Sequence, residues 1–164
     1  MTTQNQLKLS PLIIEHHEFC SIRINASDVE SPQGRQSLRA IRHVERVPND
    51  PRRWVIVLRI EFFSMEEADP APYTGEIVAR GRFAVNESYP AERESALIEI
   101  TAASILYGAC REMIASYTAR SSHGILSLPS VSFSAMGEIK SVAAKASKNP
   151  AKKLSQAAEK TPKK

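Results

Sequence analysis

The chain has 164 residues, of which 42% are hydrophobic, and its formal net charge is +4. This length and apolar content predict one compact domain with a real core and exclude a chain that is disordered throughout. No apolar run approaches the roughly 20 residues that cross a bilayer, and two cysteines are too few for a disulfide scaffold. The start of the chain lacks the pattern of a secretory signal, so we expect a cytoplasmic protein.

The charge is divided unevenly along the chain. Residues 138–164 contain eight lysines and two acidic residues, which gives this part a net charge of +6 and leaves residues 1–137 at −2. Before residue 138 the basic side chains are thirteen arginines and one lysine, whereas the tail uses only lysine. The basic character belongs to the tail, and it is weak evidence that the folded part binds nucleic acid.

The first half of the chain has the pattern of four β-strands. Residues 12–24 predict a strand with a bulge near 16–18, where the alternation of apolar residues slips. Residues 38–47 mix apolar side chains with arginines and predict an edge strand. Every second residue is apolar in 54–63 and in 73–85, as in strands with one buried face. The links are short and carry no helix, which predicts an antiparallel meander.

The period of the apolar residues then changes to that of a helix. Residues 102–120 place apolar side chains at three- and four-residue steps, and Gly124 can end this helix by taking a positive φ. An extended apolar stretch follows at 125–133, and residues 135–146 predict a second, shorter helix. Strands followed by helices predict an α+β domain, with a four-stranded antiparallel sheet, a long helix and a shorter C-terminal helix.

Motifs that mark an enzyme are missing from the sequence. There is no glycine-rich phosphate loop and no nucleophile elbow, so we expect no catalytic residue and no cofactor. His16, His17 and Cys20 lie close together, but adjacent residues of a strand point to opposite faces. A fourth zinc ligand would have to come from His123 or Cys110, beyond the helix. Surface histidines and a small buried thiol at Cys20 are the simpler interpretation, and we expect no metal site. Cys110 lies on the apolar stripe of the helix and is expected to be structural.

The amount of apolar surface is the most unusual property of the sequence. The predicted sheet has apolar residues on parts of both faces, and the predicted helix has a broad apolar stripe. Together they carry more hydrophobic area than one monomer can bury. Such a surplus is typical of oligomer contacts or of a groove for other chains. A well-filled core with the helix lying on the sheet is the alternative, and composition leaves both open.

Two segments resemble the SecB family of export chaperones. They are Ile105-Leu-Tyr-Gly-Ala-Cys-Arg-Glu-Met-Ile114 in the long helix and Leu126-Ser-Leu-Pro-Ser-Val-Ser-Phe133 after it. In that family an aromatic residue and an Arg-Glu pair follow Ile-Leu on the long helix, and a Leu-x-Leu, proline, Val-x-Phe segment leads to the final helix. Residues 57–60 and 76–85 are similar to strands of the family. The similarity covers residues 10–137 in the same order.

The resemblance implies a homotetramer, assembled as a dimer of dimers, that acts as an ATP-independent holdase. Such a protein binds unfolded or precursor polypeptides in hydrophobic grooves and keeps them competent for export. Glu76 matches one of the acidic residues with which the family docks on the translocase motor ATPase SecA. The side chains that match the groove or lie beside matching positions are Tyr73, Leu106, Tyr107, Met113, Leu126, Leu128, Val131, Phe133 and Met136.

The tail separates this chain from the acidic family that it resembles and leaves two alternatives open. Some SecB-like proteins protect the antitoxin of a toxin–antitoxin system, and a dedicated antitoxin chaperone would use the same groove for another client. The lysine-rich residues 140–164 could instead bind nucleic acid or another acidic partner through phosphate contacts. We expect a flexible N-terminus at 1–9, a SecB-like chaperone domain at 10–147 and a disordered tail at 148–164.

Overall fold

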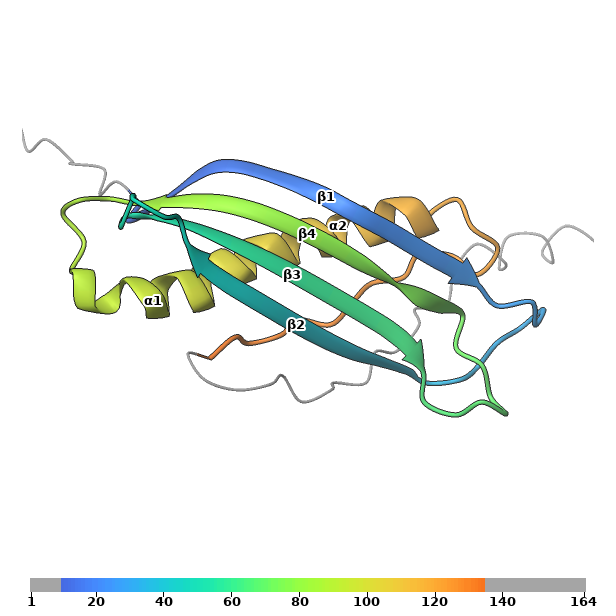
Figure 1. Ribbon diagram of the computed structural model, residues 1–164. Coiled ribbons are helices and arrows are strands. Elements are labelled where there is room, and N and C mark those ends of the chain that lie inside the picture. Colours follow the sequence, from blue (N-terminus) through green and yellow to red (C-terminus); the bar gives the residue numbers. More distant parts are fainter. Residues whose placement is uncertain (1–9, 135–164) are drawn as a thin grey trace, which may run out of the picture.

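The computed structural model describes residues 10–134 as a sheet layer with a helix layer on one face (Figure 1). The sheet consists of β1 Leu12–Ala26, β2 Gln36–Arg46, β3 Arg53–Ser64 and β4 Tyr73–Val85. The helical part consists of a 3₁₀ turn at Ala91–Arg93, α1 Glu94–Leu97, a π-helical turn at Ile98–Ala102 and α2 Ala103–Thr118. The predicted α+β class, with its four-stranded antiparallel sheet and long helix, is confirmed. The predicted second helix at 135–146 lies outside the described residues.

The strands lie in the order β1-β4-β3-β2, and every neighbouring pair is antiparallel. β2 lies at an edge, as predicted. The expected meander is wrong for β1, which pairs with β4 and not with β2. The link over residues 27–35 crosses the end of the sheet and bonds to the β3–β4 connection, where Gly34 N donates to Pro70 O. Glycine is needed there, because a Cβ would lie 1.9 Å from the carbonyl oxygen of Asp69.

Two bulges explain why the alternation slips in β1. The register against β4 shifts between Ile14 and His16 and again between Phe19 and Ser21. Each shift adds one residue to β1, so the side chains that face the helix layer are those at positions 12, 14, 17, 19, 22 and 24. The bulge predicted near 16–18 is therefore confirmed within one residue, and the second bulge restores the face of the strand.

The core lies between the sheet and α2, which crosses β3 and β4 (Figure 1). Alternate residues of β3 from Trp54 to Phe62 and of β4 from Tyr73 to Val85 face the helix layer, and most are nearly free of solvent. The helix meets them with Leu106, Cys110 and other side chains that are at most 4% exposed. Within residues 10–134, none of the helices is long and apolar enough to cross a membrane.

The helical part begins earlier than the sequence predicts. Its first turn lies at Ala91–Arg93, whereas the apolar period predicts a start at residue 102. The reason is the π-helical turn at Ile98–Ala102, which has more residues per turn than an α-helix and breaks the 3.6-residue period. The predicted end is correct: α2 stops at Thr118, and Gly124 takes a φ of 78°.

Candidate functional site

An extended segment after α2, residues 125–134, is called the strap below. It passes along the helix side of the sheet toward β2 (Figure 1). Leu126, Leu128 and Phe133 are at most 6% exposed, whereas Ile125 is 58% exposed. The strap therefore has an inner apolar face and an outer face, like a strand. Among the described residues, however, no backbone–backbone hydrogen bond joins residues 125–133 to any other segment.

Side chains hold the backbone of the strap at three points. Leu126 N donates to Thr118 Oγ1 at 2.8 Å, and Tyr107 Oη donates to Pro129 O at 2.6 Å. Arg42 Nη2, from β2, donates to Ser134 O at 2.5 Å. The Arg42 guanidinium also lies 5.7 Å from the centre of the Phe133 ring. These bonds satisfy polar groups that a partly buried, unpaired backbone would otherwise leave without partners.

The structure brings most of the predicted groove residues together, but it buries them. Six of them are at most 6% exposed, namely Tyr73, Leu106, Tyr107, Leu126, Leu128 and Phe133. Met113 and Val131 are half-buried and pack against the same core. Met136 lies outside the described residues. In this structure the side chains join the sheet, α2 and the strap into one core, so their role as the lining of a groove stays a prediction.

Burial also determines the protonation of two side chains on α2. It raises the pKa of Tyr107 to about 12, although the nearby Arg111 guanidinium acts to lower it. It likewise raises the pKa of the Cys110 thiol to about 12. Both groups stay neutral near pH 7, so Tyr107 acts as a hydrogen-bond donor. Cys110 is buried, as the sequence predicts. The predicted burial of Cys20 is wrong: Cys20 is exposed, because it lies in the second bulge of the edge strand β1.

The helix layer also carries apolar side chains that this chain leaves in water. Ile105 and Tyr117 on α2 are 38% and 57% exposed, and Ile14, on the same side of β1, is 47% exposed. Gly108 follows Ile105 by about one turn of α2, and a Cβ built there meets nothing within 4 Å. Tyr117 lies on another side of the helix, about 120° around its axis from Ile105. We call Ile14, Ile105, Gly108 and Tyr117 the open apolar surface. Exposed apolar side chains beside a bare backbone allow another helix or chain to approach closely.

The opposite face of the sheet carries several ion pairs beside the exposed side chains of Ile13, Ile41 and Phe63, and we call it the polar face. Glu76 is already paired there. Arg59 Nη2 donates to Glu76 Oε2 at 2.5 Å, and Arg59 Nε lies 3.0 Å from Glu61 Oε1. Arg39 lies 3.7 Å from the second carboxylate oxygen of Glu61, and Arg23 is the register partner of Glu76 on β1. The register row across the four strands runs Arg23, Glu76, Glu61 and Arg39, and Arg59 pairs with both of its carboxylates. The face does not present the acidic surface that docking through Glu76 implies.

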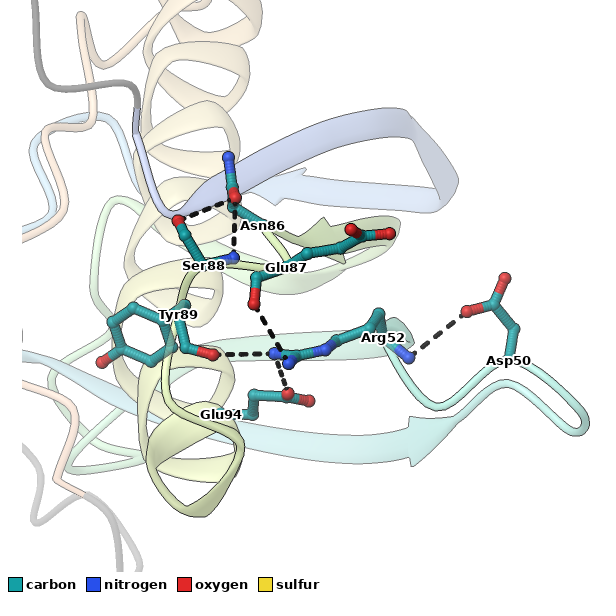
Figure 2. Close-up of polar contacts among 7 residues, drawn as sticks. All are labelled: Asp50, Arg52, Asn86, Glu87, Ser88, Tyr89 and Glu94. Atoms are coloured by element: carbon teal, nitrogen blue, oxygen red, sulfur yellow. Dashed lines mark hydrogen bonds and ion pairs between the residues drawn. The ribbon is translucent and has the colours of Figure 1, made fainter.

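An ion pair fixes the start of the helical part to the end of the sheet (Figure 2). Arg52, in the β2–β3 turn, pairs with the carboxylate of Glu94, and its Nη1 donates to Tyr89 O at 2.9 Å. Its Nη2 donates to Glu87 O at 3.3 Å, and Asp50 Oδ1 accepts the Arg52 backbone N–H. Glu94 is only 2% exposed. One guanidinium therefore closes the loop that connects β4 to the helix layer.

Three residues of these sites went unnoticed in the sequence. Arg42, Arg52 and Glu94 each act across long stretches of chain, 92 residues for Arg42 and Ser134 and 42 for Arg52 and Glu94. Arg42 does carry a signal, because it stands at an inward position of β2 where the alternation predicts an apolar side chain. Within residues 10–134, no group of His, Cys, Asp and Glu side chains could hold a metal ion.

Comparison with known proteins finds a structural likeness. No protein-family model matches the sequence, and no curated protein matches it. The Mycobacterium tuberculosis SecB-like chaperone Rv1957, solved in complex with a ChAD peptide from the Rv1956 HigA1 antitoxin, covers 74% of this chain and 91% of its own, at 18% identity and a TM-score of 0.59. A Streptococcus agalactiae protein of unknown function covers 72% and 96%, at 14% identity and a TM-score of 0.43. The first likeness shows that the chain has a SecB-like fold.

Proposed function

We propose that the protein is an ATP-independent holdase that works in the cytoplasm as an oligomer and binds unfolded polypeptides. The observation that carries the proposal is the open apolar surface. Its side chains reach 57% exposure at Tyr117 in a domain that otherwise packs its core tightly. Apolar burial is non-directional and worth about 25 cal/mol per Å², so such a surface binds many unfolded segments without reading their sequence closely.

The same surface supports assembly into a homotetramer. The bare backbone at Gly108 permits a close helix–helix approach, and Ile105 beside it supplies the apolar area that such a contact buries. A closed assembly of identical subunits would cover part of the open apolar surface and leave the remainder to clients. Subunits and clients would therefore bind to the same set of exposed apolar side chains. This agrees with the surplus of apolar surface that the sequence predicts.

A dedicated client, such as an antitoxin, is the second candidate, and the polar sheet face favours it over general export. Export requires docking on SecA, for which Glu76 is the predicted contact. Arg59 already neutralises Glu76 at 2.5 Å, and Arg23 stands opposite it in the register. Furthermore, the solved structure that shares this fold contains a peptide of an antitoxin. Both observations support a chaperone that serves one client rather than the translocase.

Holdase activity is tested by the suppression of aggregation of a chemically unfolded model enzyme, followed by light scattering. We expect the full chain to suppress aggregation at near-stoichiometric ratios without ATP. A variant that ends at Ser147 should suppress it equally well, because the apolar surfaces lie within residues 10–134. If the shortened variant loses the activity, the lysine-rich tail is the binding element. The proposal would then be replaced by one in which the tail binds acidic partners.

The export route is tested with purified SecA by calorimetry. Because the Glu76 carboxylate is occupied by Arg59, we expect Glu76→Gln to change the affinity for SecA less than twofold. Glu45→Gln is the control, because Glu45 is also a carboxylate that pairs with a neighbouring side chain, in its case His43, but it lies exposed on β2. A complex with SecA that Glu76→Gln weakens tenfold, and Glu45→Gln does not, would favour export over a dedicated client.

A further inference from the structure

We infer that the strap is the protein's own occupant of a client site and that an extended segment of a client replaces it there. The inference rests on the proposed function and names the regulation of that function. It starts from the unusual way in which residues 125–134 are bound. Leu126, Leu128 and Phe133 are buried like the inner side chains of a strand, yet within the described part of the chain residues 125–133 share no backbone–backbone hydrogen bond with another segment.

The strap is bound as a peptide ligand is bound. Its inner face presents Leu126, Leu128 and Phe133 to the core, while serines fill the exposed positions between them. Thr118 and Tyr107 of α2 and Arg42 of β2 form hydrogen bonds with its backbone. These three side chains contact main-chain atoms of the strap, which every polypeptide has. Any extended segment with apolar residues at alternate positions and small neutral residues between them fits the same contacts.

When such a segment replaces the strap, the contacts that are lost and the contacts that are gained are of the same kind and number. The client segment would bury apolar side chains where the strap had buried its own, and the three polar contacts would pass from one backbone to the other. What favours the strap is its covalent attachment, which gives a tethered segment an effective concentration on the order of 1 mM. A client with one weak apolar stretch cannot compete with this. An unfolded chain with several such stretches can, and the strap thus sets a threshold for binding.

A weaker strap should therefore bind clients more tightly. Leu128→Ala removes most of a side chain that is 1% exposed and leaves Thr118, Tyr107 and Arg42 in place. We expect the affinity for a fluorescent, carboxymethylated, permanently unfolded lactalbumin to rise about tenfold, as measured by anisotropy on the full chain. Ile125→Ala is the matched control, because Ile125 lies on the outer face of the same strap at 58% exposure. This variant should bind like the unaltered protein.

A synthetic peptide with the sequence of residues 124–134 provides the second measurement. It should compete with the unfolded lactalbumin and should bind the Leu128→Ala variant more tightly than the unaltered protein. If Leu128→Ala does not fold, as judged by circular dichroism, Leu128→Val should give a smaller rise of the same sign. A tenfold loss of affinity in a folded Leu128 variant would show that the strap is a wall of the site, which overturns the inference and leaves the holdase intact. If no form binds the unfolded probe, the proposed function itself fails.

Discussion

Replacement of Glu94 by alanine is expected to lower the free energy of unfolding by about 3 kcal/mol, because it removes the buried carboxylate of an ion pair and leaves the partly buried Arg52 guanidinium without its partner. The Glu94 side chain is 3% exposed, whereas that of Arg52 is 31% exposed, and this places the effect at the lower end of the range for buried pairs. Arg52 would lose its carboxylate and keep only carbonyl acceptors from Glu87 and Tyr89. Urea denaturation followed by circular dichroism measures the change.

The control for this prediction is Glu92→Ala in the preceding turn. Glu92 is an exposed carboxylate, so its removal should change the free energy of unfolding by less than about 0.5 kcal/mol. Arg52→Ala should cost at least as much as Glu94→Ala, because it leaves the buried Glu94 carboxylate without its partner. The double variant should cost much less than the sum of the two. Equal, small effects of Glu92→Ala and Glu94→Ala would mean that the ion pair does not hold the helical part to the sheet.

A charge at Ile105, beside the bare backbone of Gly108, is expected to dissociate the assembly. In Ile105→Glu, a carboxylate replaces a side chain that is 38% exposed in the single chain and that assembly would bury, and an unpaired charge in a contact is costly. Light scattering should show a mass of several subunits for the unaltered protein and one near 18.2 kDa for the variant. Suppression of aggregation should fall strongly in parallel.

Ile41→Glu separates the loss of an interface from a general effect of added charge. Ile41 is 48% exposed on the other face of the sheet, among the ion pairs of the polar face. This variant should keep the mass and the activity of the unaltered protein. An unaltered protein that is already a monomer at micromolar concentration would contradict the proposed assembly, and equal dissociation by both substitutions would contradict its location.

The strands were predictable because their signal is local. Alternation in 54–63 and 73–85 depends only on which residues face the core, and the observed strands agree with it within one residue. The pairing of β1 with β4 was not predictable in this way. It depends on where the link at 27–35 bonds, and the contacts of Gly34 with the β3–β4 connection join residues far apart in sequence. Alternation identifies a strand without naming its neighbour.

The candidate site shows the same division between local and distant information. The apolar pattern of the strap indicated that Leu128 and Phe133 matter, but it could not indicate whether they line an open groove or fill it. That depends on Tyr107 and Arg42, which fix the strap from another helix and another strand. The open apolar surface was expected from composition as a surplus. Its location on α2 required the fold, since the same helix buries Leu106 and exposes Ile105.

The buried residues of the helical part form a repeat of four, at positions 94, 98, 102, 106, 110, 114 and 118, and each is at most 2% exposed. In an α-helix, a step of four residues advances the row by about 40° around the axis. The π-helical turn at Ile98–Ala102 has more residues per turn and cancels part of this rotation. Over the rest of the helical part, the row of buried side chains runs obliquely around the helix axis. The row therefore meets different partners along its length: Arg52 at Glu94, the core of the sheet at Leu106 and the strap at Thr118.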